Sequence, residues 1–253
     1  TMALFESGNP TLSEKMFDKA GHAQANEAGT MSVRGTMNKF GLMLIGVIAG
    51  AGYTWHLIDQ NNPSLAQTLM IVGVIGGLIT ALAIIFKPNW APALAPAYAI
   101  LEGLFLGAIS KVFNDAFYPG IVVQAVGLTF GVAVAMFLLY NFRIIKPTEK
   151  FRSMIMSATL GIAIFYLLTW VLGLFGVDVS FVRDNSMLSI GISLFIVAIA
   201  ALNLILDFDM IEQGAERGAP KFMEWYAAFG LMVTIVWLYL EILRLLSKLS
   251  SRD

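Results

Sequence analysis

The residues of this chain best suited to chemistry are acids at the end of a long apolar segment. Asp207, Asp209 and Glu212 follow that segment, and Asn203 precedes Asp207 by four residues. On a helix, residues four apart share a face, so Asn203 and Asp207 are expected together and Asp209 is expected to point elsewhere. Glu212, three residues after Asp209, could join it. A carboxylate beside hydrocarbon is costly unless it is paired, hydrated or protonated, so Asp207 indicates a functional site.

Carboxylate oxygens of this kind suit calcium ions or protons better than zinc or copper. The residues after Asp207 and Asp209 lack the spacing, the glycine and the closing glutamate of an EF-hand loop. Asp207 is therefore a candidate ligand for a weakly bound calcium ion. For Asp209 and Glu212 the alternative is the solvated edge of a short acidic connection.

A further acid, Glu102, lies near the middle of another apolar segment, within AYAILEGLFLGAIS. An acid at this depth must face the interior of a helix bundle or water. Two interpretations remain open, a residue lining an ion path and a hydrogen-bonded structural acid.

The inventory of reactive side chains argues against an enzyme. The chain has no cysteine and two histidines, His22 in a polar tail and His56 near the end of an apolar segment. No nucleophile elbow, phosphate loop or paired-histidine motif is present. We expect no catalytic residues and no cofactor.

The elements that position these acids are membrane helices. Of 253 residues, 58% are hydrophobic and 13% charged, against about a quarter charged in soluble domains. The apolar runs are continuous rather than alternating, which favours helices over a β-barrel. We predict an all-α, seven-transmembrane helix bundle, each span about twenty residues long. The predicted spans are about 40–58, 65–86, 93–113, 121–142, 154–177, 187–206 and 226–246.

The chain divides into a polar tail, 1–38, and a membrane domain, 39–253. Thr11 and Glu14 fit a capping box, which predicts a short amphipathic helix on the membrane surface; a solvated tail is the alternative. With the N-terminus cytoplasmic, 11 of the 16 Lys and Arg residues fall inside. Three of the five outside lie at or after the end of the last segment, so six spans with a re-entrant last segment are the alternative. The net charge of −1 gives no indication of nucleic-acid binding.

Two simpler patterns predict packing. Glycines recur at four-residue spacing, which lets helix backbones approach closely. Glu241 and Arg244, three residues apart, are expected to form an ion pair within the last helix. The glycine pairs are Gly46/Gly50, Gly73/Gly77, Gly103/Gly107 and Gly127/Gly131.

A family resemblance rests on three stretches: AYAILEGLFLG, LDFDMIEQGAERG and WYAAFGLMVTIVWLYLEILRLL. With them the chain resembles the transmembrane Bax inhibitor motif family, in its bacterial YccA-like branch, over about 36–249. The resemblance implies a seven-helix bundle with the last helix central. It also implies a calcium leak controlled by pH, in which two aspartates share a proton because two adjacent like charges cannot both stay ionised.

At this proposed switch the chain departs from the family pattern. Asp207 matches the first aspartate, at the end of the sixth helix. The second position falls at or near Thr234, which can hydrogen-bond a carboxylate but cannot share a titrating proton with it. Asp207 is then left to pair with Asp209, Glu102 or Arg143, or the switch is lost.

Three functional hypotheses follow. The first is a calcium-permeable leak of the bacterial inner membrane, pH-sensitive or constitutive, with Asp207 and Glu102 on the ion path. The alternative is a membrane adaptor that binds a membrane-bound ATP-dependent protease, or other membrane proteins, through its tail. A weaker alternative is a proton-coupled transporter that uses Glu102.

Overall fold

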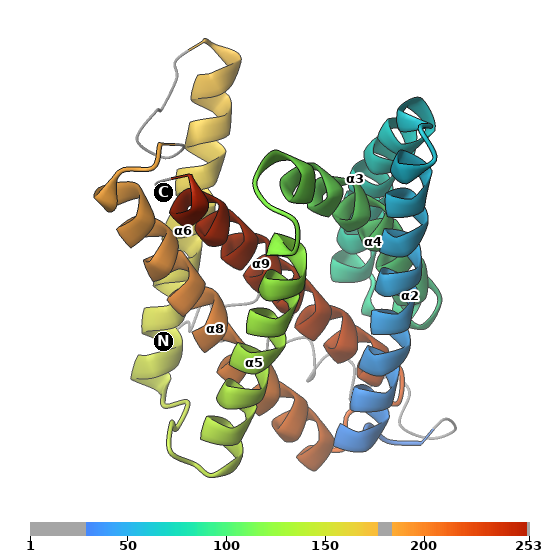
Figure 1. Cartoon of the computed structure of the whole chain (residues 1–253). Coiled ribbons are helices and arrows are strands. Elements are labelled where there is room, and N and C mark those ends of the chain that lie inside the picture. The colour runs from blue at the N-terminus through green and yellow to red at the C-terminus, as the bar shows by residue number, and fades with distance from the viewer. Residues whose placement is uncertain (1–28, 177–183, 252–253) are drawn as a thin grey trace. The chain divides into compact units, whose positions relative to one another are not determined.

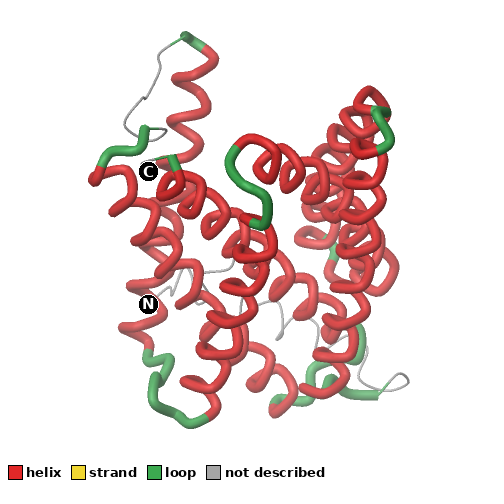
Figure 2. The backbone as a smooth tube through the Cα atoms, in the orientation of Figure 1, coloured by secondary structure: helices red, strands yellow, loops and turns green. Residues whose placement is uncertain are grey.

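The computed structural model describes residues 29–176 and 184–251. Within them the chain forms helices and no strands, and seven helices are long and apolar enough to cross a membrane (Figures 1 and 2). The prediction of an all-α protein with seven spans is therefore confirmed. The helices are α2 (Val33–Asp59), α3 (Pro63–Phe86), α4 (Ala91–Ala116), α5 (Ile121–Asn141), α6 (Glu149–Leu174), α8 (Met187–Glu216) and α9 (Met223–Ser250), with a 3-10 turn, η1 (Pro88–Trp90), before α4.

The first membrane helix begins earlier than predicted, at Val33 rather than near residue 40. Ser32 is its N-cap, and the Ser32 hydroxyl accepts a hydrogen bond from the Gly35 N–H at 3.0 Å. The polar tail therefore ends before residue 33 and not at residue 38. The capping box at Thr11 and Glu14 lies outside the described residues.

The sixth membrane helix is also longer than predicted. α8 continues past residue 206 to Glu216, so Asp209 and Glu212 lie on a helix and not in a connecting loop. Two residues after the end of α8, Gly218 has a φ of 66°, a left-handed conformation that glycine adopts readily. α9 follows as one continuous helix of 28 residues, whereas a re-entrant segment would have to fold back on itself.

The chain forms two compact units, which we describe separately. The α2–α4 unit comprises described residues 29–116 and 207–233, and so includes the end of α8 and the start of α9. The α5–α6 unit comprises described residues 117–206 and 234–251, and includes the start of α8 and the end of α9.

In the α2–α4 unit, α4 packs against both α2 and α3 (Figure 1). Three of the four predicted glycine pairs lie at these contacts. Gly46 and Gly50 of α2 face α4, Gly73 and Gly77 of α3 also face α4, and Gly103 and Gly107 of α4 face α2. The fourth pair does not fit the prediction. Around Gly127 and Gly131 of α5, no described atom lies within 4 Å of an added Cβ.

The core of the α5–α6 unit is made by branched aliphatic side chains of α6 and α8. Ile155 and Ile162 of α6 pack with Ile196 and Ile199 of α8, and Trp237 of α9 packs against them. Among the seven helices α9 is the most buried, with 67% of its most apolar stretch inside.

Candidate functional site

Asp207 is the most enclosed of the predicted site residues. It has an exposed fraction of 0%, and Asn203, one helical turn earlier on α8, has 2%. Because α8 is continuous through both positions, the two side chains share a helix face as predicted. The Asp207 carboxylate is therefore shielded from solvent at the end of a twenty-residue apolar run.

The neighbouring acids differ from the expected loop edge. Asp209 is buried and accepts a hydrogen bond from Gln213 Nε2 at 2.7 Å, one turn further along α8. Glu212 is partly exposed on the same helix. The acidic stretch is therefore a folded helix end with a buried polar pair, rather than a solvated connection.

Glu102 lies on the α4 face that meets α3. The hydroxyl of Tyr98, one turn earlier, hydrogen-bonds the Glu102 carboxylate. Across the interface is Gly77 of α3, where an added Cβ would lie 3.2 Å from Glu102 Oε2. Glu102 is only partly buried, so its carboxylate combines a protein contact with some exposed surface.

The remaining predicted residues belong to the other unit. Thr234 is buried on α9. Arg143 follows α5, is exposed, and holds its guanidinium 5.0 Å from the centre of the Tyr140 ring. Asp207 and Glu102 are part of the α2–α4 unit, whereas Asn203, Thr234 and Arg143 are part of the α5–α6 unit.

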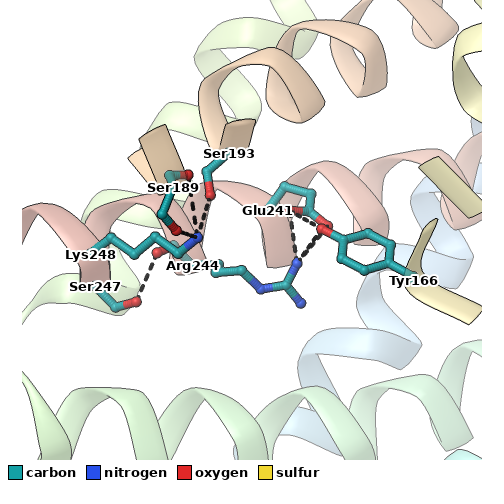
Figure 3. A network of polar contacts seen from close by, with 7 residues as sticks. All are labelled: Tyr166, Ser189, Ser193, Glu241, Arg244, Ser247 and Lys248. Carbon is teal, nitrogen blue, oxygen red and sulfur yellow. Dashed lines mark hydrogen bonds and ion pairs between the residues drawn. The ribbon is translucent and has the colours of Figure 1, made fainter. Parts of the chain in front are cut away.

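A polar network in the α5–α6 unit combines one predicted pair with residues that the sequence did not indicate. The Glu241–Arg244 ion pair is confirmed, with an N–O distance of 3.0 Å. Tyr166 of α6 donates a hydrogen bond to the Glu241 carboxylate at 2.9 Å (Figure 3). Glu241 is buried, so its charge is held by both a cation and a hydroxyl.

The same network contains a buried lysine. Lys248 Nζ donates to Ser189 Oγ at 2.7 Å and to Ser193 Oγ at 2.9 Å, both on the first turns of α8 (Figure 3). An ammonium group inside a protein needs such oxygens to replace lost water. Sequence reasoning missed this contact because Lys248 is 59 residues from Ser189, and only the tertiary fold brings them together.

A second ionic site fastens the start of α2 in the α2–α4 unit. The Glu224 side chain, 0% exposed, forms ion pairs with Lys39 and with Lys221, the latter at 2.8 Å. Its Oε1 also accepts hydrogen bonds from the Ser32 N–H and hydroxyl, both at 2.9 Å. Just before Ser32, the chain pairs with the α8–α9 connection through Met31 N–H to Ala219 O at 2.7 Å. We call this set of contacts the Glu224 clasp.

These sites offer charge and hydrogen bonding rather than metal coordination. Among residues 29–176 and 184–251, no three His, Cys, Asp or Glu side chains converge as a metal centre requires. What Asp207 can offer an ion is one carboxylate on a helix, which suits passage or weak binding better than tight chelation.

A family model described as Bax inhibitor 1 like covers residues 9–251, nearly the whole chain. Comparison with curated proteins returns no match.

Proposed function

The chain belongs to the Bax inhibitor 1 like family of membrane proteins, and from this premise we propose that it is a calcium-permeable leak of the bacterial inner membrane. Asp207 and Glu102 line the ion path, and acidification changes the flux. The calcium leak is what the family resemblance leads us to expect, and Asp207 and Glu102 are the two carboxylates that we assign to its path.

The observation that carries the proposal is the burial of Asp207. A carboxylate at 0% exposure in an apolar membrane helix costs several kcal/mol unless hydrogen bonds, a proton or a cation compensate its charge. An ion path supplies the last two.

The test is calcium flux into dye-loaded proteoliposomes, with the pH stepped from 8 to 6. The Asp207→Asn variant is compared with Asp115→Asn, the same chemical change at an exposed carboxylate at the end of α4. We expect Asp207→Asn to change the flux or flatten its pH dependence, and Asp115→Asn to behave as the parent protein. Equal fluxes in all three proteins between pH 8 and 6 would contradict the leak.

A second candidate function, a membrane adaptor, is favoured by the Glu224 clasp. Residues 29–32 are held against the α8–α9 connection. In this reading the residues before them form the binding segment for a membrane-bound ATP-dependent protease. Deleting residues 1–28 keeps the clasp and should abolish co-purification with that protease. Retained co-purification would rule out the tail as the docking segment.

A further inference from the structure

A polar contact joins α6 and α8 in the α5–α6 unit. Asn203 Nδ2 on α8 donates to Thr159 Oγ1 on α6 at 2.9 Å and to the Ile199 carbonyl of its own helix at 2.8 Å. The apolar part of α6 begins after the charged residues of its first turn, near residue 154, and the apolar part of α8 ends at residue 206. At 1.5 Å per residue, Thr159 and Asn203 therefore lie about 5–8 Å inside one edge of the hydrocarbon layer.

The orientation of the Asn203 amide follows from its partners. The Ile199 carbonyl can only accept a hydrogen bond, so the amide nitrogen, and not the oxygen, must face it. Both N–H groups of Asn203 are then used, one toward Ile199 and one toward Thr159. Its oxygen Oδ1 is left pointing away from both.

Asn203 Oδ1 is buried and has no hydrogen-bond partner within residues 29–176 and 184–251. A buried acceptor without a partner is destabilising, and native proteins leave few such groups. The contact between α6 and α8 accounts for the hydrogen bonds of the Asn203 amide nitrogen, but it gives the amide oxygen no partner. The oxygen requires something that presents a hydrogen or a positive charge to it.

We propose that Asn203 and Thr159 form a hydrated site inside the membrane, where Asn203 Oδ1 binds a water molecule or a cation that carries its hydration water. Both ligands would bind the amide oxygen through a positively charged group, which is either a hydrogen of a water molecule or the cation itself. Thr159 is only partly buried, which gives the ligand an approach from α6. The cation arm rests on the proposed leak, whereas the water arm does not.

The absence of cysteine from the chain allows a direct test. Thr159→Cys places a single thiol of nearly the same size at the site, and the adjacent Leu160→Cys places one on the exposed apolar surface of α6. A thiol reacts as the thiolate, which forms only where water reaches it. A membrane-impermeant methanethiosulfonate should therefore modify Thr159→Cys in liposomes at least tenfold faster than Leu160→Cys.

Each outcome decides one point. Equal modification rates for Thr159→Cys and Leu160→Cys, or no modification of Thr159→Cys, would overturn the site. If Thr159→Cys does not fold, Asn203→Cys allows the same measurement from α8. Slower modification in millimolar calcium indicates a hydrated cation, and an unchanged rate indicates water. Rapid modification in a protein without calcium flux keeps the site and rejects the leak. Flux without modification keeps the leak and rejects the site.

Discussion

Gly50 lies at a close backbone contact between α2 and α4, and replacing it should separate the two helices. A Cβ added at Gly50 would lie 2.6 Å from the Ile100 carbonyl oxygen and 3.0 Å from the Leu104 nitrogen. Both are backbone atoms of α4, which cannot turn aside as a flexible side chain can. Two residues along the same helix, a Cβ at Gly52 would meet no described atom within 4 Å. Gly50→Ala and Gly52→Ala therefore differ in packing alone.

The expected magnitude combines two opposing effects. Alanine is favoured over glycine within a helix by about 1 kcal/mol, and both variants gain this. Overpacking a tight contact costs about 1–3 kcal/mol, with backbone against backbone at the upper end, and only Gly50→Ala incurs it. Gly50→Ala should then lose about 2 kcal/mol in the free energy of unfolding while Gly52→Ala gains about 1. The difference of about 3 kcal/mol is roughly a hundredfold in the unfolding equilibrium.

The assay is unfolding of the purified protein in mixed micelles by sodium dodecyl sulfate, followed by far-ultraviolet circular dichroism. Tryptophan fluorescence provides a second probe because Trp55 lies on α2. Equal unfolding midpoints for Gly50→Ala and Gly52→Ala would refute the close backbone contact between α2 and α4.

Three further variants test the ionic sites by the same unfolding assay. Glu224→Gln leaves Lys39 and Lys221 facing a neutral amide. Because these lysines are 18% and 45% exposed, the free energy of unfolding should fall by about 2–4 kcal/mol, less than for a fully buried ion pair. The control is Glu216→Gln, at an exposed position, which should leave the stability unchanged. A Glu224→Gln protein as stable as its control would show that the clasp contributes nothing. Tyr166→Phe removes a hydrogen bond to a charged carboxylate and should cost about 1.5–3 kcal/mol; no loss would mean that the ion pair suffices alone. Ser189→Ala removes one acceptor from the buried Lys248 ammonium and should cost a similar amount, and an unchanged midpoint would show that other oxygens replace it.

The membrane helices could be predicted because hydropathy depends on local sequence alone. The ends of α2 and α8 could not be placed from hydropathy, since both helices continue into polar residues. At α8 the stretch MIEQGAER loses hydropathy but consists largely of good helix formers. The actual stop comes just before Gly218 and Pro220, a glycine and proline pattern that ends helices. At α2 the sequence signal for the start of the helix is Ser32 as N-cap. This signal is hard to recognise because Gly35, a poor helix former, follows three residues later.

The candidate site was predictable only where its residues lie on one helix. Asn203 with Asp207, and Glu241 with Arg244, follow from helical spacing. Lys39 and Glu224 are 185 residues apart, and Thr159 and Asn203 are 44 apart. Such pairs depend on how helices pack, and no pattern in a single sequence reports that packing.

The length of α8 makes the surroundings of Asp207 depend on the lipid as well as on the protein. Its apolar part, residues 187–206, has twenty residues and spans about 30 Å, the thickness of a typical hydrocarbon layer. Asp207 is the next residue and so lies at the boundary between acyl chains and headgroups. A thicker bilayer would surround this end of α8 with hydrocarbon, and a thinner one would surround it with hydrated headgroups. Hydrophobic mismatch would then change the polarity of the medium around the protein at the depth of Asp207, and with it the cost of a charge there.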